Sequence, residues 1–388
     1  MDIKSLKYIF AALICGMSFV SCIEDGHTSS PSDQPEFSVD VLDMGVVFTG
    51  DKSPTHSFVV RNRHDKILTV SDIRFHDAAD EDIFHLNVDG LSGTSFSGLE
   101  IRPNDSIFVF ADASLPVNGS GVLTARRAQV DFTVNGVVSS VFLEIHGQDV
   151  VRKTDVTVTG DERWNADFPY QIFGCLNVEE GATLTLAPGV RLHFHDGASL
   201  NVAGRLVCEG TAEAPILMDG DRFGAVVGRI PYEIMSNQWK GVTFGPNSTG
   251  NSLAYTVIRN TVNGVTLDRD EEAQQDATVP DLKLLNCRLT NSGGYVLYAR
   301  NRNVRAVGTE FSEASSGLVY IERGHHEFSH CTLANNYLFT AVGGPAIWVE
   351  GEDTSLNMSN SIIYGIGGDI YPGDFSGRDV LIQRCIML

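Results

Sequence analysis

The 388-residue sequence predicts an all-β protein in which an N-terminal β-sandwich precedes a right-handed parallel β-helix, a solenoid of stacked coils. Apolar and polar residues alternate through most of the chain after residue 36, which is the pattern of half-buried strands. The second half of the chain is also self-similar at a base period of 22 residues, and periods of that size are typical of solenoids.

The N-terminus has the features of a secretory signal. Lys4 and Lys7 precede a 13-residue apolar run at 8–20, which is shorter than the roughly 20 residues that a membrane-spanning helix needs. The run ends at Ser21-Cys22, which resembles the lipobox of bacterial lipoproteins, whose cysteine is lipidated. We expect residues 1–21 to be a lipoprotein signal peptide and Cys22 to carry the lipid. The alternative is ordinary signal-peptidase cleavage that leaves Cys22 a free thiol.

A polar segment, residues 22–36, follows and is expected to be a flexible tether. Its Glu24-Asp25 pair resembles the acidic export signal of surface lipoproteins in the Bacteroidetes, which implies an outer-membrane anchor displayed at the cell surface. Removal of residues 1–21 changes the net charge from −21 to −22. A field of that sign repels nucleic acid, and it repels acidic polysaccharides unless cations bridge them.

Residues 37–150 are expected to form the β-sandwich. Six or seven short strands with period-two patterning are separated by turn residues, of which Asn135-Gly136 is a good hairpin turn. The strand order looks like that of the immunoglobulin-like domains that precede larger modules in secreted bacterial proteins. The pattern specifies no ligand.

Residues 154–388 are expected to form the β-helix, because five of their stretches share one register. Each has a small residue at the fourth position of the shared register and a large apolar residue at the sixth. When the coils stack, equivalent residues form columns that face the interior. Burial of each large residue is worth roughly 1.5–3 kcal/mol. The small column is Thr256, Cys287, Thr309, Cys331 and Ser361; the large column is Ile258, Leu289, Phe311, Leu333 and Ile363; and a third column, expected at a left-handed corner with stacked amides, is Asn260, Asn291 and Asn335.

A family resemblance supports this fold. Residues 164–267, with WNADFPYQIFGCLNVEEGATL and the later WKGVTF, resemble the right-handed β-helix, pectin-lyase-like lipoproteins of Bacteroidetes. The resemblance implies the fold of the second domain. It says little about activity, because this fold hosts lyases, hydrolases, adhesins and inert stalks.

The segment VRLHFHDGASL (190–200) places two histidines on one strand. We expect His193 and His195 to face outward together, since Leu192 and Phe194 keep the inward alternation. A catalytic metal needs about three protein ligands, and we expect no third ligand from the neighbouring coils. A solvated polar strand face is therefore favoured over a metal site, and Asp219 to Asp221 are interpreted as a polar turn.

Two charged clusters are candidates for other chemistry. Calcium prefers clustered oxygen ligands. An acidic insertion offers such ligands, namely Asp268, Asp270, Glu271 and Glu272. The alternative is that this insertion is a solvated loop without a bound ion. An acid, a cation and bases that resemble those of polysaccharide lyases on this fold occur together in Glu322, Arg323, His325 and His326. Nothing in their spacing demands that chemistry.

Four aromatic residues are candidates for a sugar-binding platform, namely Trp239, Tyr298, Tyr320 and Trp348. Tyr298 and Tyr320 are 22 residues apart and are expected to stack, on the surface or in the core. No cofactor is expected apart from calcium.

The last ten residues repeat the coil register, so the chain ends within an inward-facing strand. We expect either that the solenoid is shortened at this end or that another chain covers it. The favoured function is a membrane-anchored module that binds extracellular polysaccharide or serves as a structural or adhesive unit. The alternative is a polysaccharide lyase or glycoside hydrolase acting on a groove of the helix.

Overall fold

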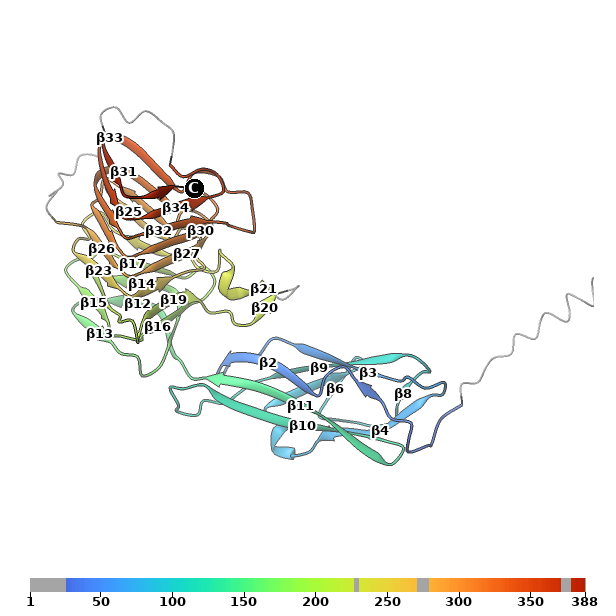
Figure 1. Ribbon diagram of the computed structural model, residues 1–388. Coiled ribbons are helices and arrows are strands. Elements are labelled where there is room, and N and C mark those ends of the chain that lie inside the picture. The colour runs from blue at the N-terminus through green and yellow to red at the C-terminus, as the bar shows by residue number, and fades with distance from the viewer. Residues whose placement is uncertain (1–25, 227–229, 271–278, 371–377, 388) are drawn as a thin grey trace, which may run out of the picture. The chain divides into compact units, whose positions relative to one another are not determined.

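The computed structural model describes residues 26–226, 230–270, 279–370 and 378–387 (Figure 1). The predicted signal peptide and Cys22 lie outside these residues. The chain divides into two compact units. Most of the second unit is the continuous segment from His146 onward. In the described part of the chain, no helix has the length and apolar character needed to cross a membrane.

The N-terminal region contains two antiparallel sheets. Phe58 of one sheet lies 6.1 Å from Phe132 of the other, and Phe75 lies 6.3 Å from Phe84 between ring centroids, so apolar faces of the sheets meet. The immunoglobulin-like assignment stays a prediction. In spatial order the first sheet is β1 (Glu36–Phe37), β3 (His56–Arg61), β9 (Ser106–Ala113), β5 (Phe84–Val88) and β6 (Leu91–Gly93); the second is β2 (Val41–Phe48), β11 (Val137–Gln148), β10 (Thr124–Val134), β4 (Leu68–Phe75) and β7 (Ser95–Phe96), with β8 (Leu99–Ile101) also on β4.

The segment expected to be a flexible tether contacts the sheets from residue 26 onward. Thr28 N donates to Ile67 O at 3.1 Å, and Gln34 Nε2 donates to Val134 O at 3.1 Å. Asn135, from the predicted hairpin turn, donates to the carbonyls of Ser30 and Asp33. Residues 26–36 are therefore attached to the sheets by backbone and side-chain hydrogen bonds, and Pro35 is buried.

The second unit contains a parallel sheet of 23 strands that winds as stacked coils, an arrangement consistent with a β-helix (Figure 1). From β15 onward the strands fall into three columns, in each of which a strand pairs with its equivalent on the next coil. The column that we call the groove face comprises β16 (Arg191–Phe194), β19 (Ile216–Gly220), β24 (Thr256–Ile258), β27 (Arg288–Ser292), β30 (Glu310–Ala314), β32 (Thr332–Asn335), β34 (Ile362–Gly365) and β36 (Ile386–Met387).

The two other columns complete each coil. The ladder face comprises β17 (Ser199–Val202), β22 (Val242–Phe244), β25 (Val265–Asp268), β28 (Leu297–Arg300) and the first halves of β31 (Val319–Ser329) and β33 (Ile347–Ser359). The last column comprises β15 (Thr183–Leu186), β18 (Arg205–Glu209), β23 (Asn251–Ala254), β26 (Leu282–Leu285), β29 (Val304–Val307), the second halves of β31 and β33, and β35 (Asp379–Gln383). The first coils also use β12 (Val151–Val158), β13 (Glu162–Trp164) and β14 (Tyr170–Val178), and an insertion carries β20 (Ala225–Val226) and β21 (Ile230–Pro231).

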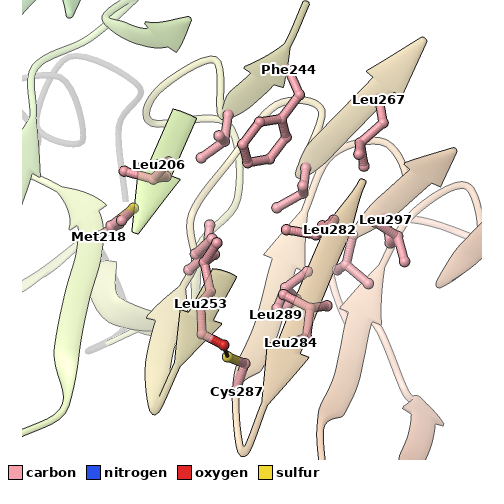
Figure 2. Packing of buried hydrophobic residues seen from close by; sticks show 14 of the residues in the cluster. Leu206, Met218, Phe244, Leu253, Leu267, Leu282, Leu284, Cys287, Leu289 and Leu297 are labelled. Atoms are coloured by element: carbon pink, nitrogen blue, oxygen red, sulfur yellow. Dashed lines mark hydrogen bonds between the residues drawn. The ribbon is translucent and has the colours of Figure 1, made fainter. Parts of the chain in front are cut away.

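The predicted inward columns are confirmed residue by residue. Ile258 pairs with Leu289, Leu289 with Phe311, Phe311 with Leu333 and Leu333 with Ile363, and each of them is at most 2% exposed. Every member of the small column is also buried. Figure 2 shows part of the buried core with Leu289 and Cys287, one member of each column, and the Cys287 thiol donates to Leu253 O at 3.2 Å. The cysteines at 287 and 331 are thus small core residues, as predicted, and burial raises the pKa of each thiol to about 11.

The prediction for the asparagine column is partly wrong. Asn260 and Asn291 do adopt left-handed φ angles of 66° and 56°, but their amides bind the insertion after β19. Asn335 does not have a positive φ, and its amide donates to Ala314 O. A left-handed corner that recurs in six successive coils lies just before the small column, where φ is positive each time. Its members are Tyr255, Asn286, Gly308, His330, Asn360 and Arg384.

Candidate functional site

The two histidines of the VRLHFHDGASL segment each bind an aspartate of the next coil. His193 Nδ1 lies 2.7 Å from Asp219 Oδ1, and His195 Nδ1 lies 2.7 Å from Asp221 Oδ2. The expectation that both histidines face solvent together is wrong for His193, which the strand pairing sets directly beside Asp219. His193 is also buried, at 4% exposure, whereas His195 is exposed. Asp219 and Asp221 are therefore hydrogen-bond partners of the two histidines rather than a simple polar turn.

Asp219 continues into a chain of ion pairs across the groove face. Its second oxygen accepts from Arg259 Nη2 at 2.9 Å, and Arg259 also binds Glu233 of the insertion. Burial opposes the charge of Arg259, but Asp219 and Glu233 outweigh it and raise the pKa of the guanidinium. The pairs fix the insertion to the coil surface.

The insertion after β19 forms one wall of a groove on this face. Its residues 232–235 turn through a short 3-10 helix, Tyr232–Ile234, and present backbone carbonyls to the coils. Asn260 Nδ2 donates to Glu233 O at 2.8 Å and Met235 O at 2.7 Å, and Asn291 Nδ2 donates to Ile234 O at 2.8 Å. These amides hold the backbone of the insertion against the coils.

The opposite wall is the loop after β32. Tyr337 is buried and packs edge-on against Phe339, with ring centroids 5.6 Å apart. Its hydroxyl is hydrogen-bonded to Ser236 Oγ, so the two walls touch. Leu338 and Phe339 keep 81% and 38% exposure, which gives this wall an apolar surface.

The groove between the walls has a volume of about 460 Å³ and a polar floor. Arg288 Nε donates to Glu310 Oε2 at 2.9 Å, and Ser312 Oγ donates to Glu310 Oε1 at 2.7 Å. Glu313 lines the same groove from a left-handed conformation (φ 54°), and burial raises the pKa of its carboxyl group. The floor thus holds two carboxyl groups in different surroundings.

Three of the four predicted aromatic residues do lie together, on the ladder face. Tyr298, Tyr320 and Trp348 are paired neighbours on successive coils, and the rings of Tyr298 and Tyr320 stack at 4.7 Å and 7°. Stacking covers ring faces that a sugar would need. Trp239 is fully buried against Phe194, so its prediction as a surface residue is wrong.

The predicted acid, cation and bases do not converge. Tyr320 Oη lies 3.0 Å from Glu322 Oε2 and 2.8 Å from Glu350 Oε2 on the ladder face. His326 is 2% exposed and bonds through Nε2 to the carbonyl of Arg323, which sits at a bulge with φ 55°. His325 is exposed beside another cavity, which is lined by Arg305 and Glu327 among others. No lyase-like arrangement of these four side chains is formed.

The acidic insertion proposed for calcium has its first carboxylate engaged. Asp268 receives Arg300 Nε at 2.7 Å and Nη2 at 2.9 Å. Asp270 is exposed, and Glu271 and Glu272 lie outside the described residues. Within the described ranges, no three histidine, cysteine or acidic side chains are placed to hold a metal ion.

Sequence reasoning missed the groove, although one signal for it was present. Arg288 and Glu310 occupy the same place in coils 22 residues apart, one position before the large inward column. That spacing predicts a cross-coil ion pair on an outward face. Glu313 and the walls had no such signal, because both walls are insertions to the repeat.

Comparison with known proteins places the chain in no family. No family model matches it, and no curated protein matches it. A solved structure with some likeness is a family 123 glycoside hydrolase from Clostridium perfringens, at 9% identity and a TM-score of 0.22. The likeness covers 32% of this chain and spans 26% of that one.

Proposed function

We propose that the groove binds an uncharged glycan chain. The observation that carries this proposal is a groove of about 460 Å³ that combines an exposed apolar wall with a floor of hydrogen-bonding groups. Sugar rings present both kinds of surface, with apolar C–H faces and hydroxyl edges. Sites for small ligands commonly combine an apolar lining with a few placed polar groups.

The charges of the groove favour a neutral ligand. Arg288 is paired with Glu310, and Arg259 is paired with Asp219 and Glu233. The groove therefore offers no strong excess of positive charge to a polyuronate, and the net charge of the whole chain, −21, repels one further. A lyase acting on uronates is disfavoured for the same reason.

Binding is tested with a matched pair of arginine variants. Arg288→Ala removes groove donors and leaves Glu310 without its partner, so we expect affinity for the bound polysaccharide to fall about tenfold, or about 1.4 kcal/mol. Arg305→Ala removes the equivalent exposed pair with Glu327 on another column, and its affinity should stay at the wild-type value. Affinity electrophoresis and calorimetry with mixed-linkage β-glucan, xylan and galactomannan supply the measurement. Equal losses in both variants would contradict the placement of the site.

We also propose that the molecule is a lipoprotein, anchored through Cys22 to the outer membrane and displayed at the cell surface, with a right-handed helix and an immunoglobulin-like domain as spacer. The apolar run before Cys22 and the polar residues after it support this proposal. A structural or adhesive role at the surface is the alternative use of the same anchored solenoid.

A further inference from the structure

We infer that the groove also hydrolyses the glycan it binds, with Glu313 as general acid and Glu310 as the base that activates water. The inference rests on the proposed function, because it needs a glycan seated between the two walls. It assigns a catalytic role to Glu310 and Glu313 of β30 (Glu310–Ala314), neither of which was a candidate site residue in the sequence.

The geometry gives the two carboxyl groups different tasks. Glu310 accepts from Arg288 Nε at 2.9 Å and from Ser312 Oγ at 2.7 Å, so donors hold its carboxylate in one orientation. Glu313 is half-buried, and the nearest donor in reach is the backbone N–H of Asn336 at 3.4 Å, a long contact. Both side chains line the same groove, whose far wall is Tyr337 to Phe339.

The environment of Glu313 also favours its neutral form. Burial raises the pKa of this carboxyl group, a backbone N–H opposes the shift, and the charge of Glu310 adds to it. Arg288, Arg259 and Glu233 line the same groove, and both arginines are already paired with carboxylates. Pairs of carboxyl groups whose surroundings separate their proton affinities are typical of glycoside hydrolysis.

The reaction balances with water as the only co-reactant. Glu313 gives its proton to the glycosidic oxygen while the bond from the anomeric carbon to that oxygen breaks. The oxygen of a water molecule bonds to the anomeric carbon, and the proton that it loses passes to Glu310. Solvent returns the two carboxyl groups to their starting states, and the products are a new reducing end and a new hydroxyl end.

The test compares isosteric variants on one polysaccharide. With the polysaccharide that binds best among mixed-linkage β-glucan, xylan and galactomannan, the intact protein should release reducing ends. Glu313→Gln and Glu310→Gln should each lower that rate about 100-fold or more while Kd stays within about threefold of wild type. Glu327→Gln, which alters an exposed cross-coil pair on another column, should leave the rate unchanged. The wild-type rate should also fall as pH rises through the pKa of Glu313.

The outcomes separate this inference from the proposed function. Binding without new reducing ends overturns hydrolysis and leaves glycan binding in place. Hydrolysis at the wild-type rate by Glu313→Gln also overturns the assignment. Absence of binding to all three polysaccharides by folded protein overturns both.

Discussion

At the scale of single residues, buried polar groups decide which sequence candidates remain available for chemistry. His326 looked like a base on a loop, but its ring is buried behind the backbone of β31 and its Nε2 is bound to Arg323 O at 2.9 Å. Arg302 is likewise fully buried, where its guanidinium donates to the carbonyls of Gly245, Pro246 and Ser248. Burial lowers the pKa of His326 to about 4 and that of Arg302 to about 10. Both side chains belong to the interior of the solenoid.

The depressed pKa of His326 predicts how the free energy of unfolding changes at acidic pH. Below the unfolded-state pKa near 6.5, the unfolded chain binds a proton that the folded chain does not, so stability falls as pH drops from about 6.5 to about 4. The full loss from this residue is on the order of 3 kcal/mol. His326→Gln keeps a donor for Arg323 O and should flatten that part of a urea-denaturation profile against pH. His325→Gln, at an exposed position, is the control and should keep the wild-type slope.

At the scale of elements, side-chain amides hold one wall of the groove, the insertion after β19. The insertion that contains Tyr232–Ile234 has no buried residue in that helix, and Asn260, Asn291 and Gln238 bind its carbonyls. A wall held in this way is positioned by a few long-range contacts. It can therefore loosen while the solenoid stays folded.

Removal of one amide tests this dependence. Asn260→Ala deletes three hydrogen bonds to the insertion and also places alanine at φ 66°, so we expect faster cleavage within residues 221–236 during limited proteolysis. Asn260→Gly keeps the conformational freedom without the amide, and it should show the same cleavage if hydrogen bonding is the cause. Protection of Asn260→Gly at the wild-type level would show that backbone strain, not the amide, matters.

At the scale of the whole molecule, the segment that precedes the sheets bears on the proposed membrane anchor. The tether was expected to run from residue 22 to 36, yet residues 28–34 hydrogen-bond to the sheets. If Cys22 is lipidated, the sheets sit only a few residues from the membrane surface.

The anchor is tested in cells that make the protein. Cys22→Ala should abolish incorporation of labelled palmitate and move the protein from the membrane fraction to the soluble one. Cys175→Ala, at a half-buried site within β14, should change neither result. Retention of label in Cys22→Ala would refute lipidation at that residue.

The predictability of the structure from sequence follows the repeat. The inward columns were predictable because stacking forces the same residue sizes into the same place, as with Leu289 above Phe311. His193 and Asp219 are 26 residues apart, outside the 22-residue period, and so their pairing was not recognised. Glu313 could be recognised as a groove residue only once the position of the loop after β32 was known. Contacts between distant insertions leave no periodic pattern in the sequence.

The hydrogen bond between Ser236 and Tyr337 has a consequence for how the protein can change over evolution. The wall residues arise from β19 and β32, which are four coil steps apart on the groove face, or roughly 19 Å at the usual strand spacing. Gain or loss of one whole coil in that interval would preserve every inward column, yet it would separate or crowd the two loops. The contact therefore requires a fixed number of coils between β19 and β32. A change in the number of coils should be tolerated outside this interval rather than within it.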